Sequence, residues 1–167
     1  DNMTVCTLEG KKIDDGTPAS LNPSSDTAAV AYVFRHMPEV GGVVHTHSTY
    51  ATAFAALHRP IPCVLTMMGD EFGGEVPVGP FAIIGDDSIG RGIVETLRSS
   101  RSPAVLMANH GPFTVGKDAE AAVKAAAMVE EVARTVATAQ LLGDPVPVAQ
   151  EHIDALYQRY QNVYGQR

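Results

Sequence analysis

A short apolar segment that ends in two histidines constrains this chain more than any other part of its sequence. Residues 40–44 are only valine and glycine and predict a short buried strand, which runs into His45, Thr46 and His47. Side chains two positions apart on a strand lie on the same face, so His45 and His47 should face the same way. A buried imidazole needs partners for a donor and an acceptor, and a divalent metal would satisfy both rings. The H-x-H pattern by itself fits structural or surface histidines equally well.

A third histidine follows a second apolar segment. Residues 103–109 predict a buried strand, and His110 comes directly after it, before a Gly-Pro pair. A side chain presented at such a sheet edge is well placed for function. With His45 and His47 it would supply three neutral nitrogen ligands, the ligand set of a catalytic zinc site with an open coordination position. We therefore predict a site for zinc or a similar divalent metal.

Composition excludes several other classes of protein. The 167 residues carry a formal charge of −7 without a basic cluster, which argues against a nucleic-acid partner. The apolar runs are far shorter than the ~20 residues that cross a bilayer, which argues against a membrane protein. Cys6 and Cys63 lack metal-ligand spacing and predict free thiols in a reducing cytoplasm. Residues 1–167 fit one domain, and because Asp1 opens on a strand-like segment, we expect an N-terminal part of the natural domain to be missing.

The pattern of apolar residues predicts mixed strands and helices with hairpin-like connections. This combination indicates an α/β fold of three layers, with a central, mostly antiparallel sheet flanked by helices. Ser24, Ser25 and Asp26 precede the first helix, where one of them would be the N-cap, although three polar residues exceed what a cap requires. We expect strands at 3–8, 40–44, 61–66, 81–84, 103–109 and 113–116, a loop at 67–74, and helices at 28–37, 48–57, 88–97, 119–142 and 149–160.

Five short motifs give the chain a resemblance to a known family. They are P-S-S-D-T at 23–27, G-G-V-V-H-T-H-S at 41–48, N-H-G-P-F at 109–113, E-E-V-A at 130–133 and Y-G-Q at 164–166. In order and spacing they resemble the class II aldolase/adducin family over nearly the whole chain. Within the family, the resemblance is closest to the epimerases that act on L-ribulose 5-phosphate. It implies a class II aldolase-like fold, a phosphorylated ketose as substrate and a homotetramer.

The resemblance also implies a metal site and a reaction. In the family, the histidines that match His45, His47 and His110 hold the metal, usually zinc, and an acidic residue lies beside it. Aldolases carry Glu at that position and the epimerases carry Asp, as this chain does at Asp26, whose shorter side chain is suited to ligating the metal. The implied activity is a reversible aldol cleavage of the L-ribulose 5-phosphate to D-xylulose 5-phosphate type.

Four further residues acquire expected roles in the same way. Ser24 and Ser25, at a helix N-terminus, fit a site for the substrate phosphate. The family's other phosphate-binding loops would lie upstream of Asp1. Asp70 and Tyr164 match the epimerase residues that transfer protons on the two faces of the substrate, as inversion at one carbon requires. Tyr164 lies near the C-terminus, so it would reach an active site most easily in a neighbouring subunit.

Two other functions remain open at this point. A class II aldolase would cleave a ketose phosphate and release the aldehyde; Asp26 and Asp70 argue against it. An adducin-like interaction module would keep the fold without catalysis, but such chains tend to lose the histidines that this one retains. A dehydratase or decarboxylase of the same fold is a weaker alternative.

Overall fold

The fold is organised around one four-stranded sheet. The computed structural model describes residues 3–14, 16, 18 and 20–164. The strands follow the order β1-β4-β3-β2, in which β1 pairs with β4 and β4 with β3 in antiparallel fashion, whereas β3 and β2 are parallel. The predicted, mostly antiparallel sheet is thus confirmed. The bounds of the strands are β1 (Gly42–His45), β2 (Val78–Gly79), β3 (Ala104–Met107) and β4 (Gly111–Gly116).

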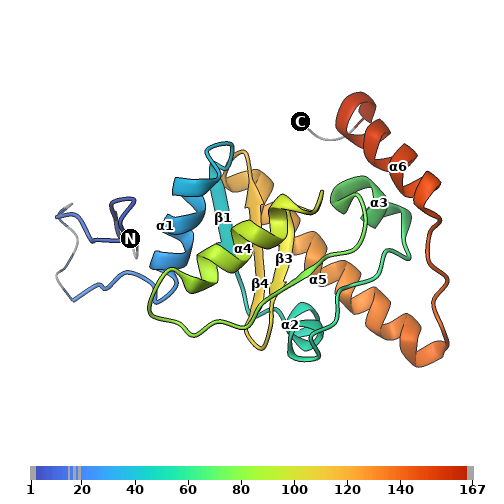
Figure 1. Cartoon of the computed structure of the whole chain (residues 1–167), viewed down its shortest axis with the longest axis horizontal. Coiled ribbons are helices and arrows are strands. Elements are labelled where there is room, and N and C mark those ends of the chain that lie inside the picture. Colours follow the sequence, from blue (N-terminus) through green and yellow to red (C-terminus); the bar gives the residue numbers. More distant parts are fainter. Residues whose placement is uncertain (1–2, 15, 17, 19, 165–167) are drawn as a thin grey trace.

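Helices cover both faces of this sheet, which confirms the predicted layers (Figure 1). On one face α1 (Thr27–His36) packs against α4 (Ser88–Arg98). On the other face α5 (Ala119–Leu142) lies along β4 and β1 and contacts α2 (Thr49–Ala56). A third group packs together beyond β3, namely α3 (Thr66–Phe72), α6 (Gln150–Arg159) and the π-helix η1 (Tyr160–Tyr164).

The central strand β3 separates two apolar cores. Its side chains alternate between the faces of the sheet, as the pleat of a strand requires. Ala104 and Leu106 join the core beneath α2 and α5, and Val105 and Met107 join the core beneath α1 and α4. All four are buried, which is why this strand reads as a continuous apolar run in the sequence.

The segment 61–74 differs from its prediction. The strand expected at 61–66 is reduced to a single bridge between Ile61 and Val76, and the loop expected at 67–74 is mostly the helix α3. Met68 and Phe72, four residues apart, are fully buried on one face of this helix. It ends at Gly73, whose φ of 62° is the left-handed conformation that favours glycine. Asp70 therefore lies on a helix.

Two other predicted strands are also wrong. At 3–8 the chain forms one arm of a small hairpin, with a bridge between Cys6 and Lys12 and a few backbone hydrogen bonds across the turn, but no regular strand. At 81–84 the chain is irregular and largely exposed, and the strand that pairs with β3 is β2, three residues earlier in the sequence. In both segments most of the large apolar side chains are exposed; Phe81 is 61% exposed and Ile83 is 75% exposed. Apolar composition without a partner layer does not make a strand.

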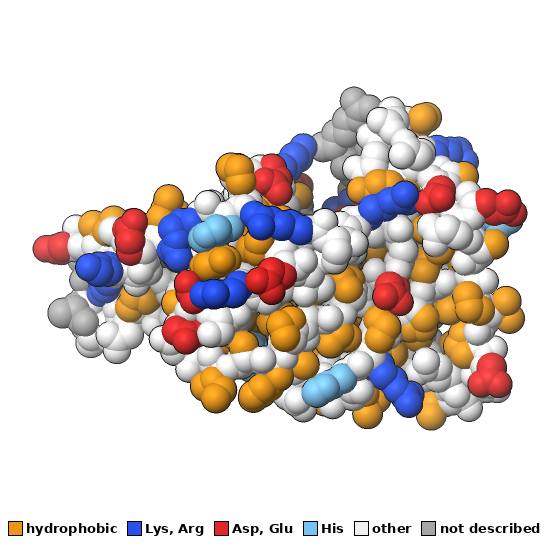
Figure 2. Space-filling view, viewed as in Figure 1, with side chains coloured by type: hydrophobic (Ala, Val, Ile, Leu, Met, Phe, Trp, Pro, Cys, Tyr) orange, Lys and Arg blue, Asp and Glu red, His pale blue; other side chains and the backbone are white. Residues whose placement is uncertain are grey.

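Acidic and basic side chains are interspersed over the surface seen in Figure 2, and neither sign dominates a continuous area. Throughout the part of the chain that the structure describes, no helix combines the length and the apolar character needed to cross a bilayer.

Candidate metal centre

His45 is the last residue of β1 and is held by two neighbours on β4. Its cross-strand partner is Phe113, and the two rings stack with centroids 4.0 Å apart. Its Nδ1 lies 3.0 Å from the carbonyl oxygen of Pro112. A carbonyl only accepts hydrogen bonds, so Nδ1 carries the proton and the neutral ring keeps a lone pair on Nε2. In metal sites, a hydrogen bond from the other ring nitrogen to a carbonyl fixes the orientation of a histidine in this way.

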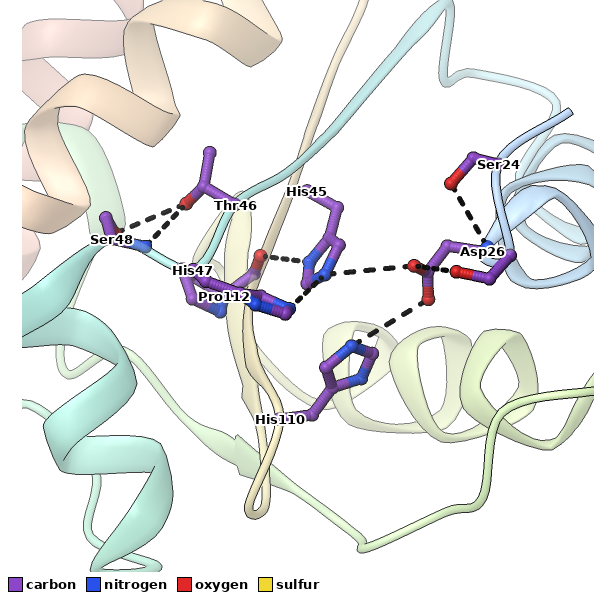
Figure 3. Close-up of polar contacts among 9 residues, drawn as sticks. Ser24, Asp26, His45, Thr46, His47, Ser48, His110 and Pro112 are labelled. Carbon is purple, nitrogen blue, oxygen red and sulfur yellow. Dashed lines mark hydrogen bonds and ion pairs between the residues drawn. The ribbon is translucent and has the colours of Figure 1, made fainter. Parts of the chain in front are cut away.

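His47 and His110 bring their rings to the same point (Figure 3). Strand β1 ends at His45, so His47 lies just beyond the strand, yet its Nε2 is 3.0 Å from Nε2 of His45. His110 lies in the turn between β3 and β4. One nitrogen of each ring lies within 4.8 Å of the other two. The structure thus brings together the three histidines that the sequence singled out, and their role as ligands stays a prediction.

A glycine permits this close approach. A Cβ atom on Gly111 would lie 2.7 Å from the carbonyl oxygen of Thr46 and 3.2 Å from the ring of His47. The first distance is shorter than any ordinary contact to backbone. Only glycine therefore lets the β3–β4 turn, with His110, lie against the segment that carries His47.

Asp26 completes the cluster from the N-terminus of α1. Its carboxylate oxygens lie 4.0 Å from Nε2 of His45 and 3.9 Å from Nε2 of His110, too far for hydrogen bonds. Asp26 Oδ1 and His110 Nε2 are buried, and within the described residues neither has a hydrogen-bond partner. Ligand atoms about 2.0–2.2 Å from one zinc ion lie roughly 3–4 Å from each other. The separations of 3.0 Å between His45 and His47 and of 3.9 and 4.0 Å from Asp26 lie in this range and, with the unpaired buried atoms, fit a divalent cation. The three nitrogens, which span up to 4.8 Å, would draw together when a cation binds.

Burial lowers the pKa of two of these rings. The pKa of His45 falls because desolvation disfavours its charged form, although the Pro112 carbonyl and Asp26 oppose the shift. Desolvation likewise lowers the pKa of His110, again partly opposed by Asp26. Both rings are therefore neutral at physiological pH, which is the form that binds a metal.

Ser24 and Ser25 lie next to Asp26, one turn before α1. Both are exposed; the Ser24 hydroxyl accepts from the backbone N–H of Asp26 at 3.2 Å, and the Ser25 hydroxyl lies 3.5 Å from Asp26 Oδ2. Ser24, Asp26 and His45 line a cleft of about 520 Å³, whose other wall includes Cys6. The histidine cluster therefore adjoins, through His45, a cavity large enough for a small ligand.

Asp70 and Tyr164 lie away from the histidines. Asp70 is on α3 and Tyr164 ends η1, and these two elements contact each other. Figure 1 shows α3 and the C-terminal helical segment on the far side of the sheet from α1. The rest of the Y-G-Q motif, residues 165–166, lies outside the described residues. Within one chain, then, the elements that carry Asp70 and Tyr164 pack against each other, away from α1, which follows Asp26.

Glu130 is a residue near the site that the sequence analysis did not single out individually. It lies on α5, and its carboxylate accepts hydrogen bonds from the backbone of Tyr50 and Ala51 in the first turn of α2. A weak signal was available: Ser48 is the N-cap of α2, and the reciprocal partner of a capping box, Glu or Gln at position 51, is replaced by alanine. The side-chain cap comes from Glu130 instead.

The sheet, its covering helices and the histidine cluster define a member of the class II aldolase and adducin family. Residues 1–137 match the family described as Class II Aldolase and Adducin N-terminal domain, so the chain belongs to it. The L-ribulose-5-phosphate 4-epimerase UlaF of Salmonella paratyphi C (strain RKS4594) is 38% identical over 143 residues, 80% of this chain and 61% of the relative. The protein of the same name from Salmonella choleraesuis (strain SC-B67) matches to the same extent. The chain thus spans 61% of the length of each of these relatives.

Solved structures share the fold. An L-fuculose 1-phosphate aldolase superposes with a TM-score of 0.83 at 23% identity, over 95% of this chain and 71% of the other. An aldolase II superfamily protein from Pseudomonas syringae gives a TM-score of 0.80 at 20% identity, over 99% of this chain and 65% of the other. This likeness confirms the class II aldolase-like fold.

Proposed function

We propose that this chain is the catalytic part of a divalent-metal-dependent epimerase that converts L-ribulose 5-phosphate into D-xylulose 5-phosphate by reversible aldol cleavage. The observation that carries the proposal is the convergence of three imidazole nitrogens beside the buried carboxylate of Asp26. The 38% identity to an L-ribulose-5-phosphate 4-epimerase supports the choice of substrate.

The cation would be held by His45, His47, His110 and Asp26. Zinc suits this set, because imidazole nitrogen and carboxylate oxygen are both common zinc ligands. Such a cation would act as a Lewis acid toward the oxygens of the substrate. The chain's own contribution is to keep His45 and His110 neutral by burial and to fix His45 through the Pro112 carbonyl. Aspartate at position 26, shorter than the glutamate of the aldolases, favours a ligand over a proton-transfer group.

The phosphate of the ketose would bind at the N-terminus of α1. The hydroxyls of Ser24 and Ser25 are exposed there, beside the cleft that holds His45. Backbone N–H groups at a helix N-terminus also attract an anion. The same contacts that hold Asp26 would then orient the substrate relative to the cation.

Asp70 and Tyr164 would move the protons of the reaction. When the bond between C3 and C4 breaks, one of them takes the proton of the C4 hydroxyl; after the aldehyde turns over, the other returns a proton from the opposite face. Their position on the far side of the sheet from α1 supports an active site shared between neighbouring subunits of a homotetramer. A cytoplasmic location belongs to the same proposal and is supported by the free thiols of Cys6 and Cys63.

An assay of the full natural chain with L-ribulose 5-phosphate tests this function. D-xylulose 5-phosphate should accumulate in the presence of zinc, and the His45→Ala variant should be inactive. Net release of an aldehyde would show an aldolase instead. No turnover by a zinc-loaded chain would favour the silent adducin-like module.

A further inference from the structure

Helix α2 is capped by a side chain from a different helix. It begins at Thr49, and Ser48 at its N-cap makes no side-chain capping bond. Instead, the two carboxylate oxygens of Glu130 lie 3.0 and 3.1 Å from the backbone nitrogen of Tyr50, and one lies 3.0 Å from that of Ala51. These nitrogens belong to the first turn, whose N–H groups have no partner within a helix.

This cap is both charged and firmly anchored. A carboxylate that accepts backbone N–H groups at a helix N-terminus gains from charge-assisted hydrogen bonds and from the helix dipole. The neighbours of Glu130 on α5, Val129 and Val132, are fully buried in the core, so its backbone cannot shift easily. Glu130 therefore joins the start of α2 to the most extensively packed helix of the chain.

The start of α2 is also the attachment point of His47. Strand β1 ends at His45, and the last backbone hydrogen bond to β4 runs from the N–H of Thr46 to the carbonyl of Pro112, at 3.3 Å. After it, only Ser48 separates His47 from the helix. Between them, the backbone N–H of Ser48 lies 3.4 Å from Oγ1 of Thr46, a long local contact. The direction of the His47 ring thus depends on where the first turn of α2 lies.

The other end of α2 reaches the third histidine. The backbone N–H of Asn109 donates to the carbonyl of Ala55 at 3.1 Å, and Asn109 directly precedes His110. Asn109 has a φ of 56°, which asparagine tolerates better than most residues. Helix α2 therefore spans the two chain segments that carry His47 and His110, and a displaced α2 would disturb both.

From these contacts we propose that Glu130 is a positioning residue of the metal centre: by capping α2 it fixes His47 in the direction of His45 and His110. The inference rests on the proposed metal-dependent function. Glu130 would touch neither substrate nor cation; it would act through the backbone of residues 48–51.

Zinc affinity measured against a competing chelator tests this role. Glu130→Ala should weaken zinc binding about tenfold, the lower end of the loss seen when second-shell partners of metal ligands are removed. The zinc affinity of Glu130→Gln should lie between those of Glu130→Ala and the unaltered chain, because an amide offers one acceptor oxygen and no charge. The matched control is Glu131→Gln, next along α5, where the side chain is exposed and pairs with Arg134; its affinity should equal that of the unaltered chain.

An uncharged cap at the N-cap position itself shows whether the cap or the negative charge of Glu130 matters. Asparagine is a strong N-cap residue, so Ser48→Asn should restore most of the affinity lost in Glu130→Ala, measured relative to Ser48→Asn alone. In the metal-free chain, the amides of Tyr50 and Ala51 should exchange with solvent faster in Glu130→Ala and return toward the original rate in the double variant.

Each outcome has a distinct reading. An unaltered chain that binds no zinc overturns the proposed function. Zinc binding that is equally tight in Glu130→Ala and in the unaltered chain overturns the positioning role alone. A loss that Ser48→Asn does not repair, with unchanged amide exchange, overturns capping as the mechanism. If Glu130→Ala does not fold, Glu130→Gln carries the same comparisons.

Discussion

At the scale of single residues, the site is a set of three imidazole rings beside one carboxylate, and only part of it was predictable. The three histidines stand out in the sequence because two follow one apolar segment at a spacing of two and the third follows a second apolar segment. The tautomer of His45 was not predictable, because it depends on a carbonyl 67 positions away along the chain. Glu130 was hidden for the same reason, since it lies 80 positions from Tyr50.

The stability of the metal-free chain should fall as the pH drops through the ordinary histidine pKa of about 6.5. Burial lowers the pKa of His45 and His110, so between the lowered value and 6.5 the unfolded chain binds more protons than the folded one. Protonation then favours unfolding, and the destabilisation grows until the pH lies below the folded-state pKa. Urea midpoints at about pH 7.5 and about pH 5.5 measure it. A variant with glutamine in place of both His45 and His110 should lose less stability over this pH range. An equal loss of stability would contradict this account.

Asp26→Asn should weaken zinc binding by about tenfold or more, because it removes the charge beside the rings while keeping the size of the side chain. The control is Asp87→Asn. Asp87 is the N-cap of α4 with nearly the same backbone conformation, φ −86° and ψ 4° against −89° and 4° at Asp26. Isothermal titration of both variants gives the comparison. Equal affinities would show that Asp26 contributes nothing to the cation site.

At the scale of elements, helices were predicted better than strands. For α4 and α5, the apolar period is visible in the sequence, and in the structure Asp118 caps α5 by accepting from the N–H of Ala121. Strand β2 was missed because two residues carry no period; it exists through its pairing with β3. Helix α3 was missed because seven residues give too short a pattern and its apolar face is completed by α6.

Gly111→Ala tests how tightly β4 must approach the His47 segment. The added methyl group would lie 2.7 Å from the carbonyl of Thr46, so the turn that carries His110 must move. We expect a loss of about 1–3 kcal/mol in stability, typical of overpacking, together with weaker zinc binding. Gly143→Ala is the control, because a methyl group there meets nothing within 4 Å. Unchanged melting temperature and zinc affinity in Gly111→Ala would contradict the described packing.

At the scale of the whole molecule, the two halves of the proposed active site lie on different sides of one chain. The metal cluster faces α1, and Asp70 and Tyr164 belong to the group formed by α3 and η1. A sequence motif can assign a residue to an active site without showing which subunit contributes that residue. Only the fold shows that the histidines and the elements carrying Asp70 and Tyr164 lie apart within one chain.

Mixing two inactive variants tests whether copies share an active site. His45→Ala should lack the cation, and Tyr164→Phe should lose at least about 100-fold in kcat through the missing proton transfer. If each site combines histidines of one subunit with Tyr164 of a neighbour, random mixed oligomers should regain activity at about one quarter of their sites. Mixed oligomers that form but stay inactive would place both groups in the same chain.

Zinc binding by the purified chain tests the central claim most directly. The convergence of the three rings predicts one zinc ion per chain by metal analysis, with binding lost in His45→Ala and in His110→Ala. It should be retained in His152→Ala, whose ring is exposed on α6. A chain that binds no zinc, or that binds it equally well without His45 or His110, would contradict the account.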